Sequence, residues 1–307
     1  MIKLLTALFL AQASAAGAKY GILLMAHGGE PAWDKEISTI AKSLDAQAPT
    51  EVALGMADDT EIQKAIFKLE KRKVGKIVAV PLFINSSSEV MDQTRFVLGI
   101  GKDPSAVLKE AMAHMPHIMM PASHHHMYSE TRVSTKLPLV MTSALDADPA
   151  VLKVLIERAK SLSKDPKKET LVLVGHGPVD DKANADWLKT MGTLADSVKS
   201  KLSFRDAQVA TIRDDSPPWV KEKAIKDLRA LVEEANKNGG TSVVVPYLIA
   251  RGGIETHITD ALKDLDYAWD GKTLCPHPAI VKWAGEVAVK GAKMDNMRVY
   301  IMEGGTK

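Results

Sequence analysis

Short apolar runs alternate with amphipathic segments along most of the chain. Two of these runs, at 21–26 and 171–175, each end in a histidine followed by a glycine. A segment with apolar residues at helical spacing follows each His-Gly pair. This repeated order of strand, His-Gly and helix predicts that His27 and His176 occupy matching positions in two copies of one unit.

The rest of the chain continues the repeat. The second pair of expected strands is TEVALGMA at 50–57 and AQVATI at 207–212, the third is 75–84 and 241–250, and the last pair of segments is 137–159 and 272–290. An amphipathic helix is expected after each strand of the second pair, and a closing helix after each fourth strand. The second half is longer between its first and third strands, and loops such as IRDDSPPW at 212–219 absorb the difference.

Strands that alternate with helices of this length predict parallel βαβ units, so each half forms an open α/β sheet with helices on both faces. Ligands of such sheets bind beyond the carboxyl ends of the strands. His27 and His176 are expected at those ends.

Size and composition exclude several classes of protein. The 307 residues, 33.2 kDa, are enough for two domains that each bury a core. The formal net charge of the chain is +2, so it lacks the excess of basic residues that nucleic-acid-binding proteins usually have. No segment after the N-terminus is long and apolar enough for stable membrane insertion.

The N-terminus has the pattern of an export signal. Lys3 precedes the short apolar run LLTALFLA, and Ala13-Ser14-Ala15 is a small-x-small cleavage pattern. We therefore expect residues 1–16 to be a cleaved signal peptide and the protein to be exported, in the periplasm. The alternative, a first strand, is less favoured because 19–29 already supplies one.

A third histidine follows the third strand of the second half. VVVPYLIARGGIETHI turns through Gly252-Gly253 and presents His257, with Glu255 close by. Two imidazoles from neighbouring strand ends have the arrangement that a divalent metal or a proton relay needs. The structural alternative is that both histidines are hydrogen-bonded turn residues.

These motifs resemble those of the class II tetrapyrrole chelatases, the sirohydrochlorin cobaltochelatase family. The similarity rests on VLVGHGP, on VVVPYLIARGGIETHI, and on the paired endings ADPAVLKVLIERA and PHPAIVKWAGEVA. It covers roughly residues 20–100 and 138–292.

The resemblance implies two similar lobes, residues 17–165 and 166–307. Each would be a four-stranded, mainly parallel sheet, with a tetrapyrrole in the cleft between them. It also implies that a divalent metal is the second substrate, Co2+ first and Fe2+ or Ni2+ next, with no organic cofactor. By position, His176 and His257 are the metal ligands.

The first half departs from the family pattern. It keeps His27, assigned to the tetrapyrrole-binding wall, but its third strand ends in INSSSEVMDQ, with Glu89 and Asp92 in place of a histidine. We therefore expect one complete metal site, in the second half, facing a degenerate partner.

Metal insertion requires the loss of two pyrrolic protons and partial removal of the water around the ion. Neutral imidazoles ligate borderline ions, and one without a metal accepts a proton near neutral pH. Glu255 or Glu89 is a candidate acceptor for the second proton. Ser87, Ser88 and Arg251 suit the carboxylate rim of the macrocycle, Arg251 through a forked ion pair. A solvated loop charge is the alternative for Arg251.

The segment 101–137 has no counterpart in the second half. It interleaves histidines with methionines: His114, His117, His124, His125, His126, Met112, Met115, Met119, Met120 and Met127. Thioethers with imidazoles bind late transition metals, which favours metal capture. Alternatively, the methionines pack in a helix or in a lid over the macrocycle.

Two other functions fit part of the pattern. One is an exported metal or tetrapyrrole carrier without turnover, which the export signal favours because cobalamin and sirohaem synthesis are usually cytoplasmic. The other is a phosphate-handling enzyme with His27 as nucleophile. The second is weakened because neither AHGGEP nor GHGPVD carries a flanking arginine.

Overall fold

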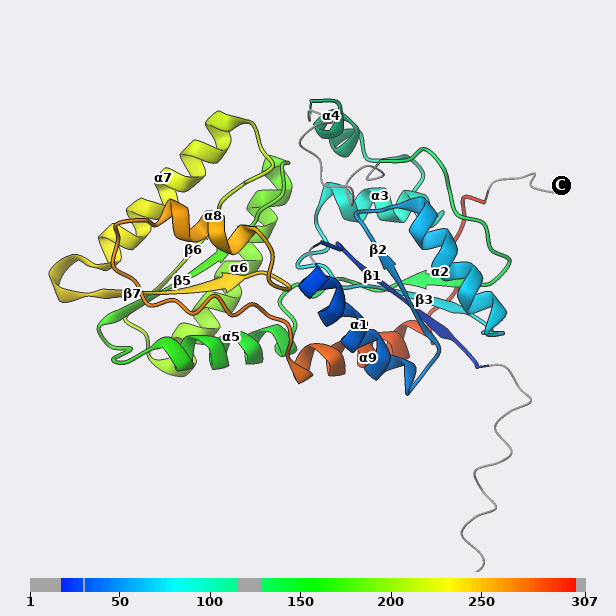
Figure 1. The fold of residues 1–307 in the computed structure, drawn as a ribbon, viewed down its shortest axis with the longest axis horizontal. Helices are drawn as coiled ribbons and strands as arrows, with labels where there is room; N and C mark the ends of the chain where they lie inside the picture. Colours follow the sequence, from blue (N-terminus) through cyan, green and yellow to red (C-terminus); the bar gives the residue numbers. More distant parts are fainter. Residues whose placement is uncertain (1–17, 30, 115–127, 302–307) are drawn as a thin grey trace, which may run out of the picture.

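The structure, a computed structural model, describes residues 18–29, 31–114 and 128–301. Two parallel sheets form two lobes that lie side by side (Figure 1). The strands of the N-terminal lobe are β1 (Gly21–Ala26), β2 (Thr50–Leu54), β3 (Ile77–Pro81) and β4 (Leu139–Met141). Those of the C-terminal lobe are β5 (Glu169–Gly175), β6 (Asp206–Thr211) and β7 (Thr241–Tyr247). The signal peptide expected at residues 1–16 lies outside the described residues.

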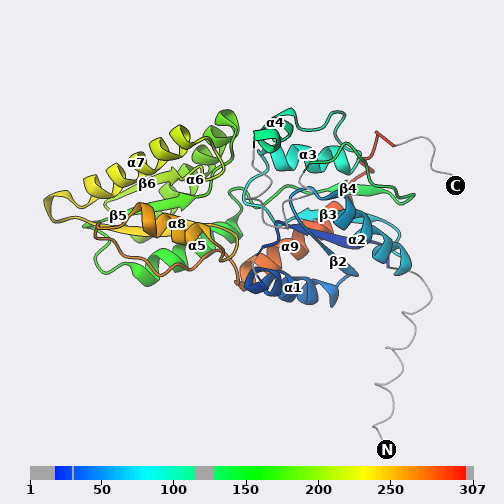
Figure 2. The same ribbon diagram turned by 45° about the horizontal axis from the view of Figure 1, so that its top comes forward.

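Helices connect the strands as the pattern predicts. They are α1 (Pro31–Asp45), α2 (Asp59–Lys71), α3 (Glu89–Val97), α4 (Ala106–His114), α5 (Pro149–Leu162), α6 (Asp181–Leu202), α7 (Pro218–Ala235), α8 (Ile254–Ala261) and α9 (Pro278–Gly291). A short 3-10 turn, Lys237–Gly239, follows α7. The helices cover both faces of each sheet (Figures 1 and 2).

The duplication is confirmed by the strand order. The sheets run β2-β1-β3-β4 and β6-β5-β7, so β1 and β5 hold the same central place between their neighbours. Every residue of β1 and of β5 is buried, which explains their continuous apolar sequences. His27 and His176 therefore follow equivalent strands. Each is succeeded by a glycine with positive φ, Gly28 at 74° and Gly177 at 79°.

The closing helices are exchanged between the lobes. Helix α5 follows β4 of the N-terminal lobe but packs against β7 and α6 of the C-terminal lobe, whereas α9 packs against β3 and α1 of the N-terminal lobe. Figures 1 and 2 both place α9 beside α1. Gly291 permits the close approach of α9, because a Cβ there would lie 2.6 Å from Val78 Cγ1. Each sheet is therefore covered in part by a closing helix that comes from the other half of the chain.

One expected strand does not form. The C-terminal sheet has three strands among the described residues, and the fourth, expected in the segment 272–290, does not form: Leu274 and Cys275 donate only to the Leu248 and Ile249 carbonyls beyond β7, and a single bridge joins Val243 to Ala268, before that segment. Ala268 makes two backbone hydrogen bonds to β7, but the chain then turns at Gly271, where φ is 66°. Tyr267 and Trp269 on either side pack onto the apolar cluster beneath. Two bulky anchors and this turn leave too little extended chain for a fourth strand.

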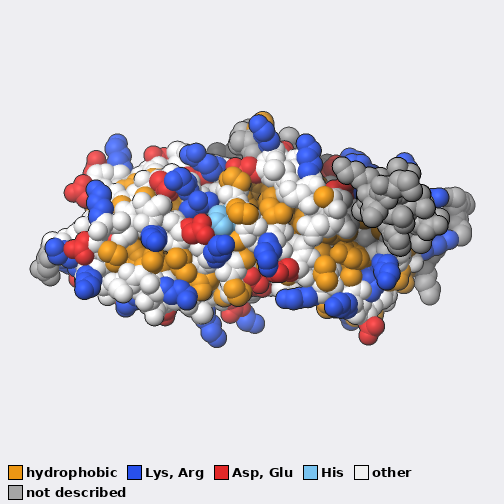
Figure 3. Space-filling view, turned by 90° about the horizontal axis from the view of Figure 1, so that it is seen from below, with side chains coloured by type: hydrophobic (Ala, Val, Ile, Leu, Met, Phe, Trp, Pro, Cys, Tyr) orange, Lys and Arg blue, Asp and Glu red, His pale blue; other side chains and the backbone are white. Residues whose placement is uncertain are grey.

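The face of the molecule drawn in Figure 3 carries charges of both signs. On the side shown in Figure 3, lysines and arginines are interspersed with acidic side chains over both lobes. None of the described helices combines the length and the apolar character needed to cross a bilayer.

Candidate metal and tetrapyrrole site

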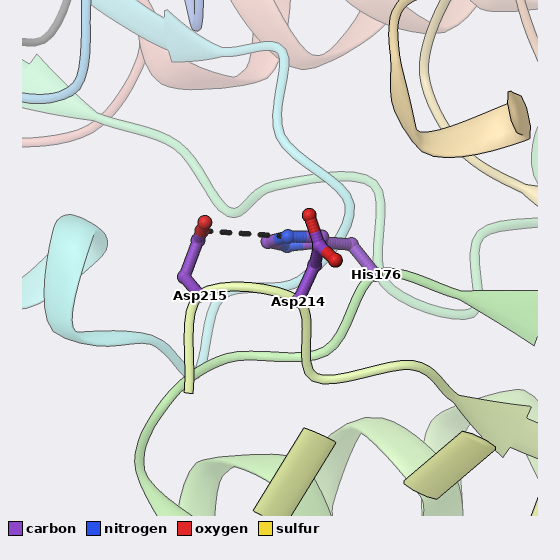
Figure 4. Close-up of side chains that lie close together, drawn as sticks. All are labelled: His176, Asp214 and Asp215. Carbon is purple, nitrogen blue, oxygen red and sulfur yellow. Dashed lines mark ion pairs between the residues drawn. The ribbon is translucent and has the colours of Figure 1, made fainter. Parts of the chain in front are cut away.

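A histidine and two aspartates meet at the carboxyl ends of two neighbouring strands. His176 directly follows β5, and Asp214 and Asp215 lie just beyond β6, its parallel neighbour. His176 Nε2 is 3.4 Å from Asp215 Oδ2. One ligand atom from each of the three residues lies within 4.8 Å of the others (Figure 4). The geometry supplies nitrogen and oxygen donors of the kind that borderline divalent ions bind.

The loop that carries the aspartates is held by Arg213. Its backbone N–H donates to the His176 carbonyl at 2.7 Å, and its buried guanidinium bonds to the Val179 carbonyl and to Asp181. Arg213 has φ at 52°, a left-handed conformation that costs energy in a residue other than glycine. These contacts keep the loop in this conformation, so the aspartates follow the strand at a fixed position.

His257 reaches the same cluster through Asp214. It lies in α8, after β7, and its Nδ1 is 2.8 Å from Asp214 Oδ2. Asp214 also forms an ion pair with Lys221 of α7. Burial would by itself raise the pKa of Asp214, but Lys221 and His257 together hold it below its ordinary value. Asp214 thus contacts His257 directly and has a carboxylate oxygen within 4.8 Å of a ring nitrogen of His176.

Glu255 occupies a different place from the one its sequence position indicates. It is buried in the first turn of α8, where its carboxylate accepts the backbone N–H of Gly252 at 2.9 Å. Among the described residues, Glu255 is not part of the group of His176, Asp214 and Asp215, whose ligand atoms lie within 4.8 Å of one another. In this arrangement Glu255 fixes the Gly252-Gly253 turn that positions α8 and, with it, His257.

The N-terminal lobe presents His27 to the cluster. Its Nδ1 lies 2.6 Å from the Gly28 carbonyl, so this nitrogen carries the proton and Nε2 carries the lone pair of the neutral ring. Trp33 of α1 lies beside it, with ring centroids 6.0 Å apart. Burial lowers the pKa of His27, and the charge of His176 lowers it further. His27 is therefore a neutral imidazole near pH 7.

Glu89 crosses between the lobes. It begins α3, and its Oε1 accepts the backbone N–H of Val179, in the loop after His176, at 3.3 Å. Burial raises the pKa of Glu89, and the nearby charges of Asp180 and Asp215 add to this. Asp92, the other acid expected there, pairs with Arg95 on its own helix at 2.7 Å. Of the two acids, Glu89 is therefore the one that faces the cluster.

Buried polar atoms without a hydrogen-bond partner are concentrated where the lobes face each other. Seven such atoms occur among the described residues: Trp33 Nε1, Glu36 Oε2, Glu89 Oε2, Arg213 Nε, Asp214 Oδ1, Ser216 Oγ and, away from this region, Arg298 Nε. Glu36 of α1 also feels the charges of Arg251 and Glu255 from the other lobe. Native proteins leave few such atoms unpaired, so a group of them is consistent with a polar ligand or ordered water between the lobes.

The serines expected at the macrocycle rim are engaged within the protein. Ser87 Oγ donates to Asp186 of α6 at 3.0 Å, and Ser88 Oγ accepts the N–H of Met91 at the start of α3. Asn85, Ser86 and Ser87 line a groove of about 580 Å³ between α3 and α6. No residue of the His176 cluster lines it. These serines therefore join the lobes in the present arrangement.

Arg251 and the long insert complete the predicted residues. Arg251 is exposed and lies close enough to Glu36 of the opposite lobe to lower its pKa, against the larger effect of burial. His117, His124, His125 and His126, with the methionines at 115, 119, 120 and 127, lie outside the described residues. Metal capture by the insert stays a prediction.

Sequence reasoning missed Asp214 and Asp215. The segment IRDDSPPW served there only to absorb a difference in length between the halves. A signal was present, because a pair of acids directly after a strand that neighbours the His176 strand must reach the same sheet edge.

Comparison with known proteins gives the family. The CbiX family model matches residues 21–162 and again 170–286, one match in each half of the chain. The chain belongs to the CbiX family. The class II chelatase resemblance of its motifs is thereby confirmed, and its double match agrees with the duplicated fold.

Two solved structures share this fold. SirB from Bacillus subtilis with Fe3+ aligns over 90% of this chain and 96% of its own, with a TM-score of 0.59 and 15% identity. DR2241 from Deinococcus radiodurans, a multi-domain protein with structural similarity to chelatases, aligns over 92% of this chain and 57% of its own, with a TM-score of 0.52 and 18% identity. No curated protein matches the sequence significantly.

Proposed function

We propose that this CbiX protein inserts a divalent metal, Co2+ first, into a sirohydrochlorin-type tetrapyrrole held between the lobes, with release of two protons. The observation that carries this proposal is the cluster of His176, Asp214 and Asp215 at the strand ends, facing His27 and Glu89 of the other lobe. The family match supports the reaction class, and the unpaired polar atoms support a ligand in this place.

In this proposal the C-terminal lobe binds the metal and the N-terminal lobe removes the pyrrolic protons. In the C-terminal wall, His176 and His257 bind the entering ion through imidazole nitrogens and replace part of its water. In the N-terminal wall, His27 is kept neutral and offers the Nε2 lone pair to a pyrrolic proton. Glu89 is the second acceptor once it is ionised. Its raised pKa makes it a better base than an ordinary carboxylate.

Residues at the edge of the proposed tetrapyrrole site orient the substrate. Arg251, exposed at the end of the β7 loop, pairs with a peripheral carboxylate of the macrocycle. Glu255 takes a positioning role in this proposal, because it holds the turn before His257. Ser87 and Ser88 bind the macrocycle only if they release their present partners. Their contribution is therefore expected to be small.

The test is an absorbance assay of metal insertion. Purified protein is incubated with sirohydrochlorin and with Co2+, Fe2+ or Ni2+ in turn, and initial rates are compared with the non-enzymatic rate. Faster insertion that is lost in His176→Ala supports a chelatase. Rates equal to the non-enzymatic reaction for every ion would refute it.

The export signal keeps a second candidate in place, a carrier of metal or tetrapyrrole. A carrier has no turnover in any version, yet loses metal affinity in His176→Ala and His257→Ala. Insertion rate and Co2+ affinity, measured on the same preparations, separate the two. We also propose export with cleavage near residue 16. An intact mass that retains Met1, in protein taken from the exported fraction, contradicts this.

A further inference from the structure

We propose that Trp33, Glu36 and Arg251 form a subsite for one peripheral carboxylate of the tetrapyrrole, at the boundary between the lobes. Trp33 donates its indole N–H to that carboxylate. Glu36 is a positioning residue that orients the Arg251 guanidinium. The subsite rests on the proposed function in taking a tetrapyrrole as its ligand, and it assigns roles to two residues of α1 that the sequence motifs do not single out.

Two buried polar atoms on α1 lack a partner. Trp33 Nε1 and Glu36 Oε2 are shielded from solvent and form no hydrogen bond. The two residues are three positions apart on the helix, so their side chains leave it on the same side. An indole N–H only donates, and an ionised carboxylate oxygen only accepts. The pair therefore needs one acceptor and one donor, which a substrate carboxylate and the Arg251 guanidinium supply.

Trp33 lies beside the site proposed for the macrocycle. Its ring centroid is 6.0 Å from that of His27, to which the proposed function assigns proton removal. The Trp33 ring packs, partly buried, against an apolar cluster with members from both lobes, and this packing holds its orientation. Figures 1 and 2 both place the start of α1, drawn in dark blue, at the boundary between the lobes. The indole N–H is therefore near the edge of a macrocycle that meets His27.

The C-terminal lobe brings Arg251 to the same boundary. The chain after β7 is held by the Cys275 N–H, which donates to the Ile249 carbonyl at 2.6 Å, and α9 begins soon afterwards and packs against α1. Burial raises the pKa of Glu36, and the charge of Arg251 lowers it, so the two side chains interact across the boundary. Arg251 is exposed and forms no hydrogen bond or ion pair with any residue that the structure describes. Its guanidinium is therefore available to a ligand.

One arginine can serve two carboxylates at once. The guanidinium presents five N–H donors in a fixed plane, so one edge bonds Glu36 while another faces a substrate carboxylate. Its positive charge also offsets the repulsion between the two acids. Glu255 lies near Glu36 as well, but its carboxylate already accepts the Gly252 N–H at 2.9 Å. Glu36 is therefore the acid that is left to orient Arg251.

The test measures binding of metal-free sirohydrochlorin, followed by its absorption and fluorescence, so that no insertion is needed. Trp33→Phe keeps an aromatic ring and removes the N–H. It should weaken binding by about ten- to 100-fold, because a hydrogen bond to a charged acceptor is lost. Glu36→Gln keeps the shape of the side chain and should weaken binding severalfold. Glu61→Gln, on α2 and paired with Lys64, is the matched control and should bind like the wild type.

Two comparisons separate recognition of a carboxylate from a general disturbance of α1. The methyl ester of sirohydrochlorin lacks the negative charges, so Trp33→Phe should weaken its binding far less than that of the free acid, with both forms delivered in the same detergent. Glu36→Gln acts through Arg251, so it should have no further effect in an Arg251→Ala background. A structural disturbance would weaken both forms of the ligand alike and would add to the effect of Arg251→Ala.

Wild-type affinity for sirohydrochlorin in Trp33→Phe would overturn the subsite and leave the unpaired atoms to ordered water. Equal losses for the acid and the ester would overturn it too, and additive effects of Glu36→Gln and Arg251→Ala would remove the positioning role. Metal insertion judges the proposed function separately. Insertion by the wild type, with unchanged binding in both α1 variants, keeps the chelatase and removes the subsite. Carboxylate-dependent binding without insertion does the reverse.

Discussion

The loops that follow β2 and β6 occupy equivalent places in the two lobes but use their acids differently. Both pass through a left-handed residue, Ala57 at φ 61° and Arg213 at φ 52°. In the N-terminal lobe, Asp58 then caps α2 by accepting the N–H groups of Thr60 and Glu61. In the C-terminal lobe, Pro217 stands at the start of α7 and provides no side-chain cap.

We propose that this difference makes the C-terminal lobe the one that binds the metal. An aspartate that caps a helix is committed to backbone N–H groups, whereas the aspartates before Pro217 remain directed at the strand end where His176 lies. The helices after the third strands show the same contrast, because Ser88 caps α3, whereas Gly253 precedes α8 and provides no side-chain cap. His257 lies in α8. A duplicated fold keeps its histidines in place, and the helix starts determine what surrounds them.

The largest expected effect separates the two equivalent histidines. His176→Ala should lower the Co2+ affinity by at least about 100-fold and abolish insertion, because a direct ligand is lost. His27→Ala should slow insertion and leave Co2+ affinity unchanged, because the proposed function assigns His27 to proton removal and not to metal binding. Calorimetry and insertion rates on both variants check this. Equal losses of affinity in the two variants would show that the lobes share one metal site.

Glu89→Gln should slow insertion without weakening Co2+ binding. In the wild type the rate should rise with pH through a value above that of an ordinary carboxyl, because burial raises the pKa of Glu89. The variant should lose this limb of the pH profile. A limb that persists in Glu89→Gln assigns it to another group.

The same carboxyl makes stability depend on pH. With a pKa raised by folding, the contribution of Glu89 is complete below the ordinary carboxyl pKa and is lost as pH rises through the raised value. Urea midpoints of the wild type should carry this slope, and those of Glu89→Gln should lack it. An unchanged slope in the variant would contradict the assigned direction.

Asp58→Ala tests the structural side of the comparison. Loss of the cap of α2 should destabilise the protein by about 1 kcal/mol and leave Co2+ affinity intact. Asp214→Asn is its counterpart, with a smaller loss of stability and a larger loss of affinity. Urea unfolding and calorimetry on the pair decide this. A metal effect in Asp58→Ala would remove the contrast between the loops.

The smallest effect on insertion is expected from a change of Arg251, at the edge of the proposed tetrapyrrole site. Arg251→Ala should raise KM for the tetrapyrrole severalfold and leave kcat nearly unchanged, because an exposed ion pair contributes little and is screened by salt. Arg251→Lys should recover part of the loss. Steady-state kinetics at low and high salt measure it, and an Arg251→Ala variant with wild-type KM at low salt would leave Arg251 as a solvated loop charge.

The sequence by itself determined most of the elements and their duplication, but not the absence of a fourth strand in the C-terminal sheet. Apolar runs such as LVLVG indicated buried strands, and the helical spacing of residues such as Ile62, Ala65 and Ile66 in α2 matched their burial. The strand-His-Gly order also placed His27 and His176 correctly, because the end of a buried parallel strand is a local property of the chain.

Only the tertiary structure decided the partners. That Asp214 lies between His257 and Lys221, that Glu89 reaches Val179 in the other lobe, and that Glu255 holds a turn all depend on how separate elements pack. The exchange of α5 and α9 between the lobes is of the same kind. Periodicity records which face of an element is apolar, but each apolar face could pack on either sheet. The choice between the sheets is a matter of shape and long-range contacts.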